Sequence, residues 1–148
     1  MLLMRLYVLW TLVAPAVILS DASKEAKLLK RAVIAVVDDD ESVREAVAGL
    51  IKSLGHVAIA FERAEDFLNS DRDRVAALIA DVQMPGMTGP ELHARLVASG
   101  QPIPTILITA YPDQLARARA LRSGVRCYLA KPFLEEDLLD CIQSALDS

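Results

Sequence analysis

Several side chains that can do chemistry follow apolar runs of the chain, one after another. They are, in chain order, Asp38, Asp39, Asp81, Thr109 and Lys131. Two carboxylates held about 5 Å apart repel by roughly 3 kcal/mol at an effective dielectric of about 20. If the three acids converge on one site, a cation is therefore needed to offset their repulsion. Mg²⁺ suits them because it prefers oxygen ligands and leaves room for phosphate oxygens.

The remaining two side chains complete a site for a phosphoryl group. The Thr109 hydroxyl and the Lys131 ammonium can hydrogen-bond and neutralise phosphoryl oxygens. A carboxylate can itself attack phosphorus to give an acyl phosphate. The set indicates a metal-assisted phosphoryl acceptor.

These side chains meet only if the runs before them are strands of one parallel sheet, because ligand sites lie at the carboxyl ends of such strands. The runs are continuous and aliphatic, as in strands buried on both faces. The expected strands are Val33–Val37, His56–Ala60, Ala76–Ala80, Thr105–Thr109 and Cys127–Ala130. A segment with helical spacing follows each strand. The sequence therefore predicts a doubly wound α/β domain, a five-stranded parallel sheet with helices on both faces.

Capping residues, glycine and proline mark the ends of the expected helices. The helix from Val43 ends before Gly55, where a left-handed cap fits, and Asp40 is placed to cap its start. Thr88 or Gly89 is expected to cap a later helix that begins at Pro90 and runs to about residue 99. The other expected helices are 64–69, 113–123 and 134–146.

The composition suits one domain with a tail. The chain has 148 residues, 53% of them apolar, and a net charge of −4, and one domain takes roughly 100–200 residues. This apolar fraction excludes a disordered chain, and the acidic balance disfavours direct binding of nucleic acid. Two cysteines are too few for a disulfide framework, so Cys127 and Cys141 are expected to be free buried thiols. His56 and His93 have no partners at metal-ligand spacing and are expected at the surface or a sheet edge.

We divide the chain into an N-terminal extension, residues 1–32, and a folded body, residues 33–148. The uncharged run Leu6–Ser20 is shorter than the roughly 18 residues that cross a bilayer comfortably. Three interpretations stay open: an over-extended translation start, which we favour, a weak membrane anchor and an export leader. We expect a cytoplasmic protein, tethered to the membrane only if residues 1–20 anchor it.

Four segments of the body resemble the response-regulator receiver domain of two-component signalling. They are Val36–Asp40, Leu78–Gly89, Thr109–Ala110 and Lys131–Phe133. The resemblance covers residues 33–148 and implies a flavodoxin-like sheet with strand order 2-1-3-4-5. Because the chain stops after the last expected helix, we expect a stand-alone signalling protein with no output domain. Such a protein would catalyse only its own phosphorylation and dephosphorylation, so it is not expected to be an enzyme.

The resemblance also implies a phosphoacceptor and a metal site. Asp81 would accept a phosphoryl group from the phosphohistidine of a histidine kinase or a phosphotransfer protein. Asp38, Asp39 and Asp81, with the backbone carbonyl of Gln83, would hold Mg²⁺.

The resemblance implies a switch as well. Thr109 would grip the phosphoryl oxygens, Lys131 would pair with the phosphate, and the bond from Lys131 to Pro132 would be cis. Tyr128 falls at the position of the family's switch aromatic and would turn inward as Thr109 moves. An unidentified downstream protein would then bind the face made by expected helix 113–123, the fifth strand and the last helix.

Two other functions fit parts of the same pattern. Asp38-x-Asp40 resembles the start of haloacid-dehalogenase-type phosphatases, in which Asp38 would be the nucleophile and Asp40 the acid and base. Ser42 departs from that pattern, a late pair of acids is missing, and there is no length for a cap domain, so we favour the receiver. A receiver-like module that docks partners without phosphorylation is disfavoured by the complete set of acids, hydroxyl and lysine.

Overall fold

The protein is described by a computed structural model, which covers residues 31–147. The described residues from Ala32 onward belong to one compact unit. The expectations for residues 1–30 lie outside the described part of the chain. Within residues 31–147, no helix has the length and apolar character needed to cross a membrane.

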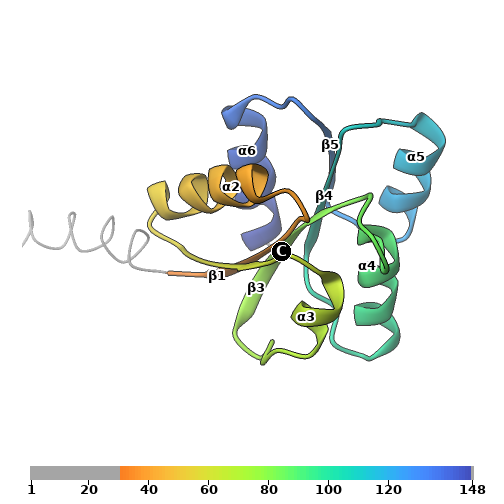
Figure 1. Ribbon diagram of the computed structural model, residues 1–148, viewed down its shortest axis with the longest axis horizontal. Helices are drawn as coiled ribbons and strands as arrows, with labels where there is room; N and C mark the ends of the chain where they lie inside the picture. The colour runs from red at the N-terminus through yellow and green to blue at the C-terminus, as the bar shows by residue number, and fades with distance from the viewer. Residues whose placement is uncertain (1–30, 148) are drawn as a thin grey trace, which may run out of the picture. The chain divides into compact units, whose positions relative to one another are not determined.

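One sheet of parallel strands forms the centre of the domain (Figure 1). Its strands are β1 (Val33–Val37), β2 (Val57–Phe61), β3 (Val75–Asp81), β4 (Thr105–Thr109) and β5 (Cys127–Ala130). Their order is β2-β1-β3-β4-β5, and every neighbouring pair is parallel. The predicted fold class and strand order are therefore confirmed.

Helices cover both faces of this sheet. They are α2 (Glu41–Ser53), α3 (Ala64–Leu68), α4 (Gly89–Ala98), α5 (Gln114–Arg122) and α6 (Glu135–Leu146). In Figure 1, α2 and α6 lie on one side of the strands, and α3 and α4 lie on the other. Alternate strand residues feed two apolar cores. Ile34 and Val36 pack with α2 and α6, whereas Ala35 and Val37 pack with α3, α4 and α5. Helices therefore cover both faces of the sheet, and a site can form only at the ends of its strands.

Capping side chains fix where the helices next to the strand ends begin. The Asp40 carboxylate accepts a hydrogen bond from the backbone N–H of Ser42 at 2.9 Å and caps α2. Thr88 caps α4, with Pro90 in the first turn. Gly55 ends the α2 segment with a φ of 85°, and these predicted signals are confirmed.

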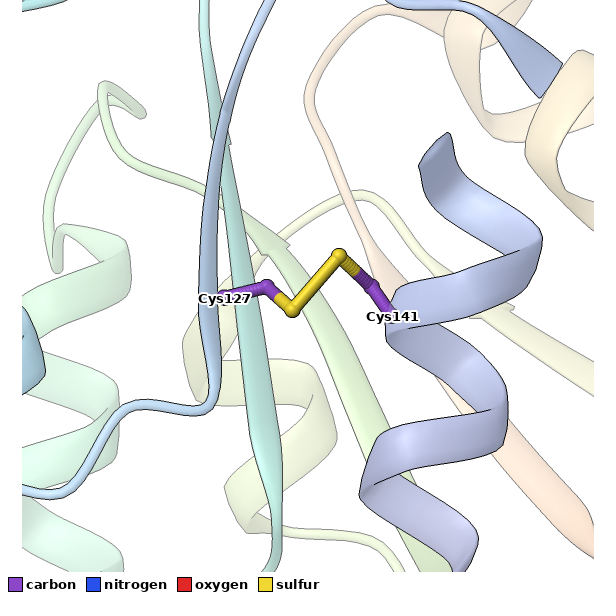
Figure 2. Close-up of a disulfide and its surroundings, with 2 residues drawn as sticks. All are labelled: Cys127 and Cys141. Carbon is purple, nitrogen blue, oxygen red and sulfur yellow. A yellow bond between two sulfur atoms is a disulfide. The ribbon is translucent and has the colours of Figure 1, made fainter. Parts of the chain in front are cut away.

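The cysteines differ from the prediction of free thiols. Cys127 of β5 and Cys141 of α6 form a disulfide, with their Cα atoms 6.0 Å apart (Figure 2). The prediction was wrong because it rested on the number of cysteines, which is too small for a framework of several disulfides. It did not consider that α6 packs back onto β5, which brings the two side chains to bonding distance.

His93 also differs from its predicted surface position. It lies on α4 with 6% of its surface exposed and lines a cavity between α4 and α5. Burial lowers the pKa of His93, which favours the neutral imidazole. His56 lies at the sheet edge, as expected, but it directly precedes β2 instead of beginning it. Its Nδ1 accepts a hydrogen bond from the N–H of Ala32 at 3.1 Å.

Candidate functional site

The strand register brings the predicted side chains to one end of the sheet. Val37, the last residue of β1, pairs with Ala80, so Asp38 and Asp81 follow neighbouring positions. Thr109 ends β4 opposite Ala130, directly before Lys131. The carboxyl ends of the three inner strands and β5 therefore supply all the predicted chemistry.

Three carboxylates form the acidic part of the site. One oxygen from each of Asp38, Asp39 and Asp81 lies within 4.8 Å of the others. Asp38 has no exposed surface and Asp81 is 6% exposed, whereas Asp39 is exposed to solvent. Two buried carboxylates and one open to solvent fit a hard cation that keeps some of its water ligands.

Lys131 supplies the positive charge among these acids. Its Nζ donates a hydrogen bond to Oδ2 of Asp38 at 3.0 Å and lies 3.5 Å from Oδ1 of Asp81. Burial alone would lower the pKa of Lys131. The hydrogen bond and charge of Asp38, together with the charge of Asp81, outweigh burial and raise it. The lysine is therefore a permanent cation at neutral pH, and its shorter contact is to Asp38.

Asp81 has an unusual protonation equilibrium. Burial, and then the negative charge of Asp38, raise the pKa of Asp81 to about 6, although Lys131 and the backbone N–H of Gln83 act in the opposite direction. A carboxyl group with this pKa is mostly ionised at neutral pH, but its ionised form is less stable than that of a carboxyl group in water. A cation that binds beside such a carboxylate stabilises its ionised form.

Thr109 and Tyr128 lie on the sheet face that packs against α4 and α5. Thr109 is fully buried, and its Oγ1 accepts a hydrogen bond from the N–H of Tyr111 at 3.0 Å. A hydroxyl that accepts in this way still has a proton to donate. Tyr128 is 9% exposed, lies in the apolar core on that face, and borders a cavity with Pro112 and Arg117.

The loop between β3 and α4 follows Asp81 directly, and it contains a contact that the sequence analysis missed. Glu65 of α3 accepts a hydrogen bond from the backbone N–H of Met87 at 3.0 Å. Gly86 beside it has a φ of 80°, which favours glycine. Nothing in the spacing of Glu65 signals this contact, because α3 must first be placed on the sheet.

Arg44 and the cis peptide complete the surroundings of the site. Arg44 of α2 donates from Nη1 to the backbone carbonyl of Asp38 at 2.6 Å, a contact that sequence spacing also did not reveal. The bond from Lys131 to Pro132 is cis, as predicted. The structure therefore brings Asp38, Asp39, Asp81 and Lys131 together, and places Thr109 at the end of the adjacent strand.

Comparisons with known proteins show the family to which this fold is similar. The profile of the family described as "Response regulator receiver domain" matches residues 34–143. The response regulator protein TmoT of Ectopseudomonas mendocina is 40% identical over 119 residues, 79% of this chain and 54% of TmoT. This chain spans about half the length of the curated relatives it matches.

Solved structures with the same fold include those of the response regulator StyR and of FixJ-N. A low-resolution structure of StyR has 39% identity and a TM-score of 0.73, over 79% of this chain and 60% of that one. A crystal structure of FixJ-N has 30% identity and a TM-score of 0.73, over 80% of this chain and 96% of that one.

Proposed function

The chain belongs to the family of response regulator receiver domains, and from this premise we propose that Asp81 is the phosphoacceptor of a two-component signalling pathway. The donor is the phosphohistidine of a histidine kinase or a phosphotransfer protein. The observation that carries the proposal is the position of the Asp81 carboxylate, 3.5 Å from the Lys131 ammonium and within one cluster with Asp38 and Asp39.

Asp38, Asp39 and Asp81, with the backbone carbonyl of Gln83, hold Mg²⁺ in this proposal. Support comes from the oxygens of the three acids, which lie within 4.8 Å of one another, and from the raised pKa of Asp81, which marks an excess of negative charge and burial. The bound ion supplies positive charge for the phosphoryl oxygens.

The reaction itself uses the residues of this chain. A carboxylate oxygen of ionised Asp81 attacks phosphorus, and the bond from phosphorus to the donor nitrogen breaks. The electron pair of that bond stays on the histidine ring. Lys131 stabilises the charge on the phosphoryl oxygens, and the Thr109 hydroxyl donates a hydrogen bond to one of them.

Phosphorylation then alters the face made by α5, β5 and α6. Moving a two-state equilibrium from 1:99 to 99:1 takes about 5.5 kcal/mol of differential interaction. A few hydrogen bonds to a charged group, at about 1.5–3 kcal/mol each, supply that amount. Thr109 and Tyr128 are the switch residues, supported by their shared burial on the α4 and α5 face. A downstream protein would bind beside Tyr128.

The alternative of a haloacid-dehalogenase-type phosphatase is not supported. Its nucleophile, Asp38, has no exposed surface. One Asp38 oxygen accepts from the N–H of Asp40 at 2.9 Å, and the other accepts from Lys131 at 3.0 Å. Asp40, the second residue of that mechanism, is engaged in capping α2.

The test is to identify the residue that becomes phosphorylated. The full chain is incubated with acetyl phosphate and Mg²⁺, trapped with borohydride and mapped by mass spectrometry. We expect the label on Asp81, no label in Asp81→Asn, and normal labelling in the control Asp40→Asn, since asparagine caps a helix as well as aspartate. A label on Asp38, or labelling that persists in Asp81→Asn, would overturn the proposal.

The cellular setting is proposed with the same pathway. We infer a cytoplasmic protein that acts by contact with its partners, without binding nucleic acid through this domain, as its acidic composition suggests. Cell fractionation with an antibody against the body of the protein tests this. Recovery of the protein only outside the cytoplasm would contradict it.

A further inference from the structure

A second reactive group lies in the same domain, away from the carboxylates. Figure 2 shows the side chains of Cys127, on β5, and Cys141, on α6, pointing toward each other and joined through their sulfur atoms. Both contribute to the apolar core on the α2 and α6 face of the sheet. They are the only cysteines of the chain, so their chemistry can be assigned without ambiguity.

The two cysteines differ in access to solvent. Cys141 is buried, with 8% of its surface exposed, whereas Cys127 is only partly buried. A small thiol or disulfide can therefore reach Cys127 first, and Cys141 is placed to attack afterwards. This arrangement of an accessible and a resolving cysteine is typical of redox-active pairs.

The bond encloses the segment that matters for the proposed switch. Cys127 and Cys141 are 14 residues apart in sequence, and Tyr128 and Lys131 lie between them. Tyr128 directly follows Cys127, and Lys131 begins the connection to α6. Joining β5 to α6 fixes both ends of this segment, so the sulfur chemistry acts on the residue that pairs with Asp81.

We propose that Cys127 and Cys141 form a reversible redox modification site that exchanges with low-molecular-weight disulfides of the glutathione class. The Cys127 thiolate attacks one sulfur of the small disulfide, whose second sulfur leaves as a thiolate. The Cys141 thiolate then attacks the Cys127 sulfur and expels the other small thiolate. In total the two cysteines lose two protons and two electrons, and the small disulfide is reduced to two thiols.

The oxidised site holds Lys131 in place for phosphoryl transfer. A closed segment has fewer conformations than an open one, so the lysine loses less freedom when it binds the phosphoryl oxygens. Oxidised protein is therefore phosphorylated faster than reduced protein. This consequence for phosphorylation rests on the proposed function of Asp81, whereas the thiol exchange does not.

The exchange is tested first, without phosphorylation. Full-length protein is equilibrated in buffers of graded reduced and oxidised glutathione, quenched with acid and labelled with a maleimide that increases its mass. We expect two labels at the reducing end, none at the oxidising end and full reversal between them. Two labels in every buffer, or a bond that dithiothreitol leaves intact in the native protein, would overturn the proposal.

Single variants test the order of attack. In Cys141→Ser, oxidised glutathione should form a stable mixed disulfide at Cys127, because this cysteine is the more exposed one. In Cys127→Ser, the buried Cys141 should react more slowly. Faster modification of Cys141 than of Cys127 would contradict the assignment of Cys127 as the attacking residue.

The effect on phosphorylation is measured last, with acetyl phosphate and Mg²⁺ on oxidised and reduced protein freed of glutathione. We expect the oxidised form to react about 2- to 30-fold faster, the range over which changes at residues between two coupled sites alter their coupling. The double variant Cys127→Ser, Cys141→Ser should show one rate after either treatment. Equal rates for the two forms of the wild type would overturn the link to Lys131. Absence of phosphorylation in both forms would overturn the function of Asp81 and leave the exchange result standing.

Discussion

The ammonium nitrogen of Lys131 lies 3.0 Å from Oδ2 of Asp38, closer than its 3.5 Å distance to Oδ1 of Asp81. The shorter contact is to the carboxylate with no exposed surface. Lys131 therefore stabilises a buried charge on the first strand while it lowers the cost of a charge on the third. The same lysine therefore contributes both to the stability of the domain, through Asp38, and to the proposed chemistry, through Asp81.

Removal of this cation should destabilise the fold. In Lys131→Met, the Asp38 charge stays buried without its partner, and such a loss costs about 3–5 kcal/mol. Because the Lys131 side chain is 18% exposed, we expect about 3 kcal/mol, measured by urea unfolding near neutral pH. The double variant Asp38→Asn, Lys131→Met should recover part of that loss. A double variant no more stable than Lys131→Met would show that the pairing is not the source of the stability.

The protonation of Asp81 should appear in the pH dependence of stability without Mg²⁺. Its pKa is raised from 3.8 to about 6 in the folded protein, so the folded state binds a proton that the unfolded state has released. The contribution of Asp81 to stability therefore falls as pH rises from about 4 to about 6, by about 3 kcal/mol at most, and stays constant above.

Asp81→Asn should remove this loss. The free energy of unfolding of both proteins is measured across the same pH range in the presence of a metal chelator. Relative to the wild type, the variant should become more stable as the pH rises from about 4 to about 6. A gap that is constant over this range, or that changes only at alkaline pH, would contradict the raised pKa.

Local sequence signals predicted the parts of the site that depend on neighbouring residues. The Asp40 cap and the turn at Gly55 each depend on a few adjacent positions, and both are confirmed. The cis bond before Pro132 is also confirmed, but it was implied by the resemblance to a family. The strand order is a property of the whole chain and came from the resemblance to a family. Register then follows, because parallel strands that end at the same edge place Asp38 and Asp81 side by side.

Contacts that depend on how helices pack could not be predicted in this way. The disulfide of Cys127 with Cys141 requires α6 to present one face to β5, and the burial of His93 requires α4 to pack beside α5. The hydrogen bond from Met87 to Glu65 joins two segments 22 residues apart. Helical periodicity shows which face of a helix is apolar, but it does not show which residue of another element that face meets.

Metal binding should depend on Asp39 although it is the most exposed acid of the cluster. Asp39→Asn removes one negative charge and a preferred ligand of Mg²⁺. We expect the affinity for Mg²⁺ to fall by at least about tenfold, which corresponds to about 1.4 kcal/mol, when measured by isothermal titration calorimetry. Asp40→Asn is the matched control, because Asp40 is adjacent, caps α2 and is outside the cluster. Equal losses in the two variants would indicate an effect of net charge and not of ligation.

The start of α4 leaves no room for a side chain behind Asp81. A Cβ at Gly89 would overlap the backbone carbonyl oxygen of Asp81 and lie 2.9 Å from Cδ2 of Leu107. Overpacking of this kind costs about 1–3 kcal/mol. Because the strand end must shift to relieve it, Gly89→Ala should also slow phosphorylation by acetyl phosphate.

Gly49→Ala is the control for this substitution. Gly49 lies inside α2, and a Cβ there meets nothing within 4 Å. Alanine at an exposed helix position stabilises by about 0.5–1 kcal/mol relative to glycine, so the two substitutions should shift the free energy of unfolding in opposite directions. Thermal unfolding of both variants beside the wild type measures this, and a stabilised Gly89→Ala with normal phosphorylation would show that the close approach of α4 to Asp81 is not needed.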